Sequence, residues 1–520
     1  MTLHHLRGPA AGLLAGALGV CVGYLAGGLT GPAGAPVAAV AEALIDISPP
    51  AVKDFAIREF GSQDKLALQA GVLAVLAVCA ALVGALARRR PAAGLAGTAA
   101  FAAAGVAAAL TRPAATAAYL LPSLLGGLAA AGALWALTRA AGARVPAARP
   151  PADPAPADPA PADPAAPPRR RFLALSAASA GAAAAAYAGG RLLTERASVA
   201  SARRSLRLPA PAVPAPALPP GSDLHIPGLA PFITPDATFY RVDTAIVLPQ
   251  IPPSSWRLRI HGMVRRELAL TFADLIRRPL IEDYITLTCV SNPVGGPYIG
   301  NALWLGASLR ALLREAGILA GADQLFCTSF DGFTCGIPVQ AAMDGRDALL
   351  AVAMNGSPLP VAHGFPVRTV VPGLYGYVSA CKWITDIEVT TYRRNVAYWA
   401  QRGWSARAPV KTESRIDVPA PGRLRAGRTV IAGVAWAQHT GIDAVEVRVD
   451  RGPWQQARLA AVPGIDTWRQ WAIDWDATQG THVITARATD AAGYTQTAID
   501  EPPAPDGATG YPAITVAVAA

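Results

Sequence analysis

Cysteine is scarce in this chain of 520 residues, and its six cysteines form none of the paired motifs that bind common metal centres. They are Cys21, Cys79, Cys289, Cys327, Cys335 and Cys381, and neither CxxC nor CxxCH occurs. This spacing argues against a structural zinc site, an attached c-type haem and an iron–sulfur cluster.

Two further absences concern charge and histidine. The apolar first third of the chain has no histidine after His4 and His5, so a bis-histidine haem between its helices is not expected. The net charge is +10, but no Lys/Arg stripe is interleaved with aromatic residues, which argues against nucleic-acid binding. The first third consists mostly of Ala, Leu, Gly and Val, and an ordinary globular mixture follows. This contrast predicts a membrane part and a soluble part.

Four apolar runs in the first 145 residues are long enough to cross a bilayer, which takes about 20 residues. They cover residues 9–29, 66–87, 92–110 and 119–138. An arginine triplet at 88–90 follows the second run, and Arg139 and Arg144 follow the fourth. Because cytoplasmic flanks carry excess Lys and Arg, we expect a four-helix membrane anchor over 1–145 with both ends in the cytoplasm. Residues 30–65, with acidic side chains and a Pro–Pro pair, would form an exposed loop outside.

A Pro/Ala/Asp repeat follows the anchor over residues 146–168, and its composition predicts a semi-rigid linker. An arginine triplet then precedes Phe172 and Leu173, which resembles the RR-x-F-L consensus of twin-arginine export. A fifth transmembrane helix over 169–193 with a cytoplasmic positive flank accounts for the same residues, and both interpretations can hold. The chain beyond would lie outside the cytoplasmic membrane, with 194–221 as a flexible linker.

Short strands, turns and helices begin at residue 222, and we expect an α+β domain over 222–408. Alternating residues predict strands, and residues 308–318 have helical spacing with Ser308 as N-cap and Gly317 as terminator. Residues 409–520 read as strands about 8–12 residues apart, which predicts an all-β immunoglobulin-like sandwich that packs or dimerises.

A hairpin turn is predicted at Asp331 and Gly332. Cys327 and Cys335 lie symmetrically about this turn. A disulfide and two unpaired strand cysteines both fit this pattern, because cross-strand disulfide geometry is demanding.

Cys289 ends an alternating stretch and is followed at once by Asn292, Pro293 and two glycines, so its thiol sits at a strand-to-loop corner. The stretch TLTCVSNPVGGPYIGNALWLGASL resembles the core of the sulfite oxidase-type molybdopterin oxidoreductases. So does LAVAMNGSPLPVAHGFPVRTVVPGLYGYVSACKW at 350–383. The resemblance covers about residues 238–392 and, more loosely, the C-terminal sandwich, which is similar to that family's dimerisation domain. It implies a membrane-anchored bacterial form of such an enzyme, with a molybdenum–molybdopterin cofactor and a homodimer as one arrangement.

By this resemblance Cys289 is the thiolate ligand of the molybdenum, a soft ligand suited to that centre. Asn292 and Arg368 would act beside it as catalytic residues. Pterin and phosphate need cations, backbone amides and acceptors. The residues that would supply them are Asp243, Thr244, Asp331, His363, Arg368, Ala380, Cys381 and Lys382.

The substrate pocket differs from that of sulfite oxidases, which usually carry an arginine just after that asparagine. This chain has Pro293 there, although Arg241 and Arg415 could restore some charge. The expected reaction is two-electron oxygen-atom transfer on a small sulfur-containing or similar oxo-substrate, with electrons exchanged with a haem or quinone-linked protein. Sulfoxide reduction and a metal-free envelope scaffold are the alternatives. Tyr284 or Tyr375 would either donate to an oxygen at the site or simply pack.

Overall fold

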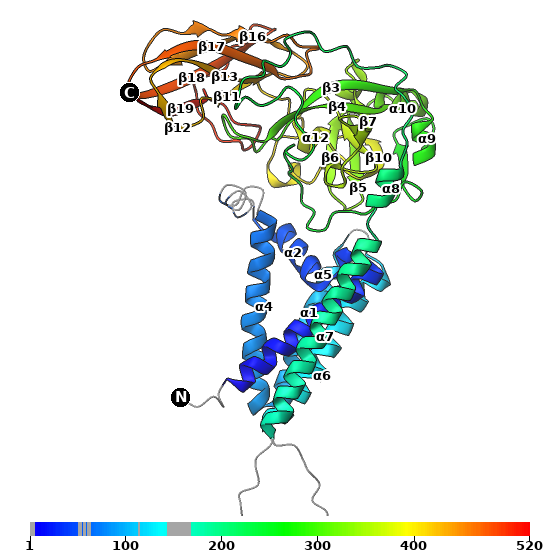
Figure 1. Cartoon of the computed structure of the whole chain (residues 1–520). Helices are drawn as coiled ribbons and strands as arrows, with labels where there is room; N and C mark the ends of the chain where they lie inside the picture. The colour runs from blue at the N-terminus through cyan, green and yellow to red at the C-terminus, as the bar shows by residue number, and fades with distance from the viewer. Residues whose placement is uncertain are drawn as a thin grey trace, which may run out of the picture. The chain divides into compact units, whose positions relative to one another are not determined.

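The computed structural model describes residues 6–49, 52, 55, 59, 64–112, 115–142 and 168–520. Its contacts divide the chain into two compact units (Figure 1). One holds Met1–Ser198 with Thr244–Leu248, and the other holds Val199–Asp243 with Pro249–Ala520. The expected linker over 146–168 lies outside the described residues, except that Pro168 begins a helix.

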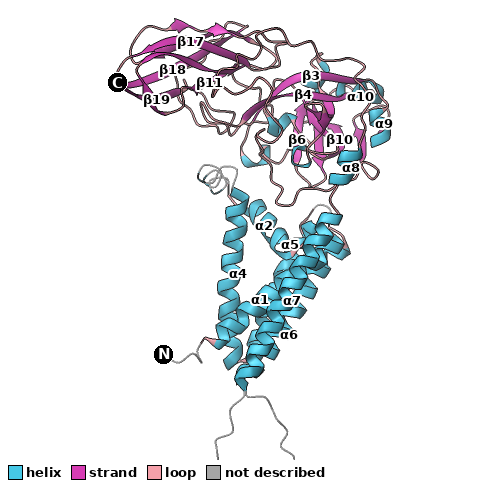
Figure 2. Cartoon of the chain, viewed as in Figure 1, coloured by secondary structure: helices cyan, strands magenta, loops and turns pink. Residues whose placement is uncertain are grey.

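The first unit is built from helices (Figure 2). The long ones are α1 (Arg7–Thr30), α4 (Asp64–Arg89), α5 (Pro91–Leu110), α6 (Leu121–Gly142) and α7 (Pro168–Arg196), and the short ones are η1 (Pro32–Gly34), α2 (Pro36–Ile47) and η3 (Ala117–Leu120). Five helices are long and apolar enough to cross a membrane by length and composition. They coincide with the five predicted apolar runs, which confirms the helices themselves.

Helix α1 contacts α4, α6 and α7 through glycine and alanine. A Cβ atom added to Gly12 would lie 1.9 Å from the carbonyl oxygen of Ala80, and one added to Gly126 would lie 2.5 Å from the carbonyl oxygen of Gly19. These backbones can approach only because the side chains are missing, as in the small-residue interfaces of membrane helices.

The expectation of an exposed loop over residues 30–65 is wrong where α2 forms. Pro36 occupies its first turn, where the missing N–H costs no hydrogen bond. Two of the acidic residues that suggested a loop are instead paired, since the Arg112 guanidinium lies 3.2 Å from the Glu42 carboxylate and 2.8 Å from that of Asp46. Composition alone could not show that these acids have a partner far along the chain.

The second unit contains a mixed α/β region with two five-stranded sheets (Figure 1). The first sheet has the order β2-β1-β10-β5-β6, formed by β1 (Arg257–Gly262), β2 (Leu268–Thr271), β5 (Gln324–Ser329), β6 (Thr334–Pro338) and β10 (Ile384–Thr390). The second has the order β3-β4-β7-β8 with β9 beside β7, formed by β3 (Leu280–Thr288), β4 (Ile299–Ser308), β7 (Leu349–Met354), β8 (Ser357–Pro358) and β9 (Arg368–Val370). The helices of this unit are α8 (Ala200–Ser205), α9 (Phe272–Ile276), α10 (Leu309–Ala316), α11 (Val339–Met343), η4 (Val361–His363), α12 (Gly376–Ser379) and η5 (Ala400–Arg402).

Local signals in the sequence place α10 and the β5–β6 hairpin correctly. The Ser308 hydroxyl accepts a hydrogen bond from the Ala311 N–H at 3.2 Å, and Gly317 ends α10 in the left-handed conformation with φ 71°. In the hairpin, Cys327 lies directly opposite Cys335. Both are free thiols, so of the two alternatives the structure has unpaired cysteines rather than a disulfide.

Residues 194–221, which their composition predicts to be a flexible linker, make hydrogen bonds to the strands of the second unit. The Arg203 guanidinium donates to the Pro358 carbonyl at 2.6 Å, and the Ala212 N–H donates to the Leu280 carbonyl at 2.8 Å. A proline-rich stretch favours extended chain, but whether that chain pairs with a strand end depends on what lies beside it in the fold.

The C-terminal region is β-rich, with two sheets of four and five strands. Their orders are β11-β13-β17-β16 and β12-β19-β18-β14-β15. The strands are β11 (Glu413–Val418), β12 (Gly422–Arg425), β13 (Gly427–Trp436), β14 (Ile442–Val449), β15 (Gln455–Gln456), β16 (Arg458–Leu459), β17 (Arg469–Ala477), β18 (Gly480–Asp490) and β19 (Ala513–Ala519). Ile431 and Ala435 from one sheet share an apolar core with Val445 and Ile484 from the other, so the sheets pack face to face.

Candidate active site

Cys289 lies directly after β3, at the corner that the sequence predicts. The residue is 8% exposed, and its N–H donates to the Tyr298 carbonyl at 2.9 Å. Burial raises the pKa of its thiol, while hydrogen bonds to Ser291 and the charge of Lys382 act in the opposite direction. The thiol is not part of a disulfide, so it is available as a ligand.

The loop after Cys289 holds a buried amide that is only half satisfied. The Asn292 Oδ1 accepts from the Tyr298 N–H at 2.8 Å, whereas its Nδ2 has no hydrogen-bond partner among the described residues. A Cβ atom on Gly296 would lie 2.6 Å from that Oδ1, so the loop can close only with glycine there. A buried donor without a partner costs about 1–3 kcal/mol, and a bound group that accepts its hydrogen bond would remove this cost.

Arg368 is a buried cation surrounded by carbonyl groups. It donates through Nη1 to the His363 carbonyl at 3.2 Å and through Nη2 to the Ala380 carbonyl at 3.5 Å, and it lies 5.2 Å from the centre of the Trp304 ring. No carboxylate pairs with it in the described part of the chain. Burial lowers its pKa to about 10, so it stays charged at neutral pH. An anionic ligand is the partner that would compensate this charge.

The His363 side chain is buried beside this arginine and meets the Phe239 ring edge-on at 5.5 Å. Burial, followed by the charges of Arg368 and Lys382, lowers the pKa of His363 to about 3. The imidazole is therefore neutral at pH 7 and can donate from one ring nitrogen while it accepts at the other.

Lys382, Asp243 and Asp331 form a second charged group. The Lys382 Nζ lies 2.6 Å from the Asp243 Oδ2, and the Arg241 Nε approaches the same oxygen at 2.8 Å. Burial raises the pKa of Asp331, Asp243 adds to this effect, and Lys382 opposes it. The structure thus brings three predicted cofactor residues together. Thr244 falls among the residues that group with the helical unit and does not enter this geometry.

Three tyrosines interact electrostatically with Cys289, and only one of them was considered from sequence. Burial raises the pKa of Tyr240, Tyr375 and Tyr377, and the nearby Cys289 adds to each shift, so their hydroxyls stay protonated at neutral pH. Tyr377 lies inside the quoted segment 350–383 and Tyr240 inside the resemblance at 238–392, but neither has a periodic signal that would assign it a role. Tyr284 instead packs in an apolar cluster of the second unit, which is the alternative to hydrogen-bond donation that the sequence left open.

Cys381, expected at the cofactor, has its thiol in the interior beside Cys335. Its N–H donates to the Thr369 Oγ1 at 2.7 Å, and the residue is fully buried. Contact with the Cys335 thiol, followed by burial, raises the pKa of Cys381, whereas the pKa of Cys335 is raised first by contact with the Cys327 thiol. The Cys381 thiol is thus engaged by another thiol, unlike that of Cys289, and the backbone of Cys381 is the part expected to contact a cofactor.

Both arginines that could restore a cationic substrate pocket are already paired. The Arg415 Nε lies 2.6 Å from the Asp417 Oδ1, while its Nη1 reaches the Gly296 carbonyl at 3.4 Å, next to the cysteine loop. Arg241 is paired with Asp243. These two arginines are therefore each balanced by an aspartate.

The comparisons with known proteins bear on this geometry. The family model for the oxidoreductase molybdopterin binding domain matches residues 245–399. Sulfite oxidase of Gallus gallus is 32% identical over 309 residues, which are 50% of this chain and 67% of that protein. The chain belongs to the sulfite oxidase family. It is therefore an oxidoreductase that depends on molybdenum–molybdopterin.

Other relatives and solved structures are also similar to this chain. Mitochondrial sulfite oxidase of Mus musculus is 30% identical over 292 residues, 46% of this chain and 53% of that protein. The chain thus spans about half the length of its mammalian relatives. The uncharacterized oxidoreductase YuiH of Bacillus subtilis is 30% identical over 154 residues, 30% of this chain and 74% of that protein. Among solved structures, the sulfane dehydrogenase SoxCD of Paracoccus pantotrophus covers 51% of this chain and 74% of its own, with 26% identity and a TM-score of 0.46.

The residues present fit the cofactor of the sulfite oxidase family. Cys289 offers a buried, unbonded thiol, and Asn292 offers an amide N–H without a partner. Arg368 is a buried cation that only carbonyl groups contact, which suits a phosphate or another anionic group. The amide donor and the guanidinium each cost free energy in an empty site, and a bound ligand that pairs with them would remove this cost.

Proposed function

We propose that this protein is a membrane-anchored oxidoreductase that transfers an oxygen atom to or from a small sulfur-containing or similar oxo-substrate. The observation that carries the proposal is the buried thiol of Cys289 at the end of β3, beside the partnerless amide of Asn292 and the buried guanidinium of Arg368. A structural cysteine would need neither neighbour.

The chain's own residues would bind and orient the cofactor. Cys289 would hold the molybdenum, and Arg368 and Lys382 would bind the phosphate of the pterin. The neutral His363 and the Asp331 carboxyl would take part in hydrogen bonds with the pterin ring. When bound, the cofactor supplies the metal centre at which oxygen is exchanged, while the protein positions the substrate and excludes side reactions.

Asp243, Ala380 and Cys381 would have supporting roles. The Asp243 carboxylate fixes Lys382 and Arg241 by ion pairs and so sets where the lysine can reach. The Ala380 carbonyl holds one nitrogen of Arg368. Cys381 would contribute its backbone, and Thr244 stays a cofactor contact expected by resemblance alone.

Sulfoxide reduction is a second candidate, and the charges around the site favour it over the oxidation of sulfite. Sulfite is a dianion at neutral to alkaline pH and calls for uncompensated cations, whereas Arg241 and Arg415 are each paired with an aspartate. The tyrosine hydroxyls near Cys289 remain protonated and can donate to the oxygen of a neutral substrate. An uncharged S–O group therefore suits the pocket better than a dianion.

The helical unit would anchor the enzyme in the cytoplasmic membrane. Five helices have the length and composition of membrane spans, and Arg88 and Arg89 lie in the last turn of α4. By the positive-inside rule these flanks are cytoplasmic, which puts the molybdopterin domain outside. The arginines at the start of α7 suit both this topology and export by the twin-arginine route.

The proposed reaction moves two electrons, so a separate haem or quinone-linked protein would exchange them one at a time. The two facing C-terminal sheets would form an immunoglobulin-like sandwich, which offers a surface for homodimerisation.

Metal analysis tests the proposal most directly. The full chain is produced in a host that makes molybdopterin, purified in detergent, and assayed for molybdenum and pterin. We expect stoichiometric molybdenum, and turnover in a screen of small sulfur compounds. A well-folded product without metal would support the envelope scaffold instead. Sulfite oxidation and sulfoxide reduction measured on one preparation then separate the two enzymatic candidates.

A further inference from the structure

A cationic and aromatic surface lies on the segment that follows β10, and the proposed oxygen transfer gives it no role. Residues 389–412 contain five cationic residues and no aspartate or glutamate. Arg393, Arg394 and Arg407 are exposed, and the Arg394 side chain is 72% exposed. Within the described chain, no carboxylate pairs with Arg393 or Arg407. We call this the arginine–aromatic surface; its members are Arg393, Arg394, Arg402, Arg407, Tyr398, Trp399 and Trp404.

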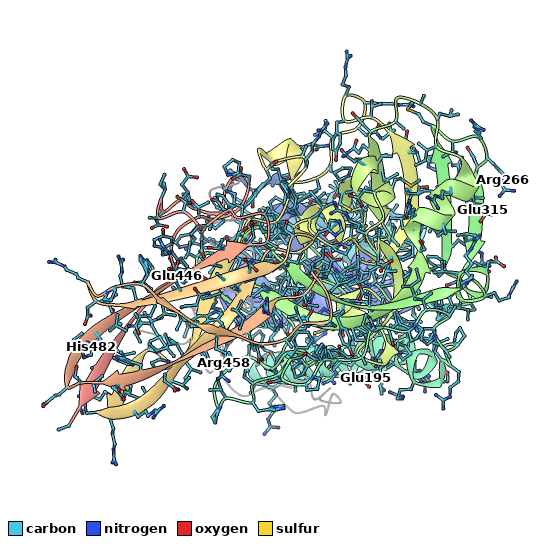
Figure 3. The ribbon with its side chains drawn as sticks, turned by 90° about the horizontal axis from the view of Figure 1, so that it is seen from above. Glu195, Arg266, Glu315, Glu446, Arg458 and His482 are labelled. Carbon is cyan, nitrogen blue, oxygen red and sulfur yellow. The ribbon has the colours of Figure 1, made fainter. Side chains whose placement is uncertain are left out.

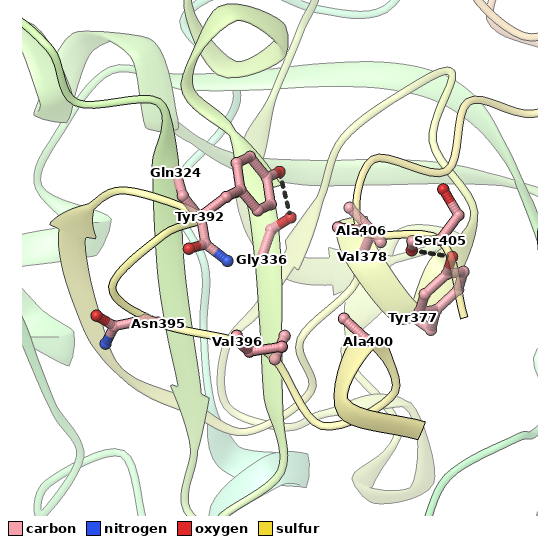
Figure 4. A pocket seen from close by; sticks show the side chains of 11 residues that line it. Gln324, Gly336, Tyr377, Val378, Tyr392, Asn395, Val396, Ala400, Ser405 and Ala406 are labelled. Atoms are coloured by element: carbon pink, nitrogen blue, oxygen red, sulfur yellow. Dashed lines mark hydrogen bonds between the residues drawn. The ribbon is translucent and has the colours of Figure 1, made fainter. Parts of the chain in front are cut away.

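The segment is fastened to the molybdopterin domain at several points. The Tyr392 hydroxyl donates to the Gly336 carbonyl at 3.0 Å, and the Tyr377 hydroxyl donates to the Ser405 carbonyl (Figure 4). The cavity between these two anchors measures about 70 Å³, which holds a few waters at most and no substrate. The surface is therefore a fixed platform rather than the wall of a ligand pocket.

A continuous row of aromatic rings leads from this surface towards the cysteine loop. Ring centroids are 5.2 Å apart between Tyr398 and Trp399, 6.1 Å between Trp399 and Trp404, and 6.1 Å between Trp404 and Tyr377. Tyr377 belongs to α12, whose first residue, Gly376, lies against the end of β3: a Cβ atom there would be 3.6 Å from the Thr288 carbonyl oxygen. Thr288 immediately precedes Cys289. The outer rings, Tyr398, Trp399 and Trp404, are each half-exposed.

We propose that the arginine–aromatic surface is the docking site of a one-electron carrier protein with an acidic surface, such as an acidic haem protein. This inference rests on the proposed function and locates its redox partner. The exposed arginines supply the charge that steers an acidic protein. Tryptophan, tyrosine and arginine are also the residues that most often carry binding energy at interfaces.

The electron balance of the proposed step is simple. With the cofactor loaded, each docking would pass one electron between the enzyme and the single redox centre of the carrier, so that one would be oxidised as the other is reduced. Two dockings complete one two-electron turnover. Electron tunnelling weakens steeply with distance, and the row of rings gives a closely spaced route from the surface to α12.

The test uses the full chain, loaded with cofactor in detergent, and an acidic one-haem cytochrome c as the probe. Binding rates are measured at low and at near-physiological ionic strength for the wild type, for the double variant Arg393→Glu with Arg394→Glu, and for Arg458→Glu. Arg458 lies on β16 and is exposed, so its reversal is the matched control (Figure 3). We expect salt-dependent binding, an association rate about tenfold lower in the double variant, and no change in the control. The variant Trp404→Leu removes one ring of the row and one member of the surface, so we expect it to weaken binding and, with the carrier at saturating concentration, to slow electron transfer to the bound carrier.

Other outcomes would overturn the inference. Equal rates for the wild type and the double variant would do so, as would an equal loss in Arg458→Glu. Vesicles containing anionic phosphatidylglycerol are measured in parallel; if the double variant loses vesicle binding but keeps the cytochrome, the surface faces lipid. Molybdenum content and turnover with a small dye acceptor show separately whether the proposed function itself holds, and they also show that the variants are folded.

Discussion

In the helical unit, α1 packs closely against its neighbours at glycine positions, which have no side chain. The molybdopterin domain, in contrast, packs around large or charged side chains that are buried. Gly12 and Gly126 bring backbones together. Arg368 and Trp304, in contrast, fill their space and bind through defined contacts. The two regions should therefore be sensitive to different substitutions. Added side-chain volume should destabilise the helical unit, and removal of a functional group should impair the activity of the molybdopterin domain.

The largest effect is expected from substitution of Cys289, the proposed metal ligand. We expect Cys289→Ser to abolish turnover and alter the spectrum of the metal centre, because a serine oxygen does not replace a soft thiolate. Cys79→Ser in α4 is the control and should leave both unchanged. An unaltered spectrum and turnover in Cys289→Ser would remove the basis of the proposed function.

A second test addresses the buried cation. Arg368→Gln should weaken cofactor retention by about 10–100-fold, because it removes the uncompensated charge beside the site while keeping a polar side chain. Pterin release during dialysis measures this effect. Arg428→Gln changes an exposed arginine on β13 and should retain pterin like the wild type. If both variants retain it equally, Arg368 does not hold the cofactor.

The helical unit is tested by adding a single methyl group. Gly12→Ala places that carbon against the Ala80 carbonyl and should reduce the free energy of unfolding by about 1–3 kcal/mol. Gly71→Ala in α4 is matched to it, because nothing lies within 4 Å of that position. There, the higher helix propensity of alanine should raise stability by up to about 1 kcal/mol. Thermal unfolding in detergent compares the two, and equal shifts would contradict the packing described for α1.

The smallest expected effect concerns a buried acid in the C-terminal sheets. Burial raises the pKa of Glu413 to about 8, while Lys411 acts against the shift. The pKa of Glu413 is higher in the folded state than in the unfolded state, so folding favours the protonated carboxyl. The resulting contribution to the free energy of unfolding is present at low pH and is lost as the pH rises towards the folded-state pKa. Asp283, raised to about 7 by burial, adds the same dependence at lower pH.

Between pH 7 and 8 Glu413 supplies most of this dependence, because the folded-state pKa of Asp283 is already reached at pH 7. We expect the unfolding free energy of the wild type to fall by at most about 1.4 kcal/mol per pH unit in this window, and Glu413→Gln to flatten the curve. Denaturant unfolding at several pH values provides the measurement. Parallel curves for the two proteins would show that Glu413 does not titrate there.

The sequence predicted those features that depend on neighbouring residues. Apolar runs gave the five long helices, and Ser308 with Gly317 gave both ends of α10. The corner at Cys289 followed from a strand running into a turn. The sequence did not predict features that depend on a distant partner. Examples are the acidic residues of α2, which pair with Arg112, and Arg203, which donates to the carbonyl of Pro358.

For the candidate site, motif resemblance placed Cys289, Arg368 and His363 in one region, but it said nothing of Tyr240 and Tyr377. Those side chains lie near Cys289 because separate segments converge there. Resemblance also assigned Cys381 to the cofactor, whereas its thiol packs against Cys335. The direction in which a side chain points depends on packing, and a sequence motif alone does not predict it.

By itself, the sequence determined that this protein has an apolar helical part, a mixed α/β part and a β-rich end, and that a lone thiol stands at a strand end. Such features arise from hydrophobic period and turn chemistry, which act over a few residues. Only the tertiary structure decided which charges are compensated, which donor lacks a partner and which rings form a row to the surface. Those properties depend on burial and on contacts between residues far apart in the chain, and neither exists before the chain has folded.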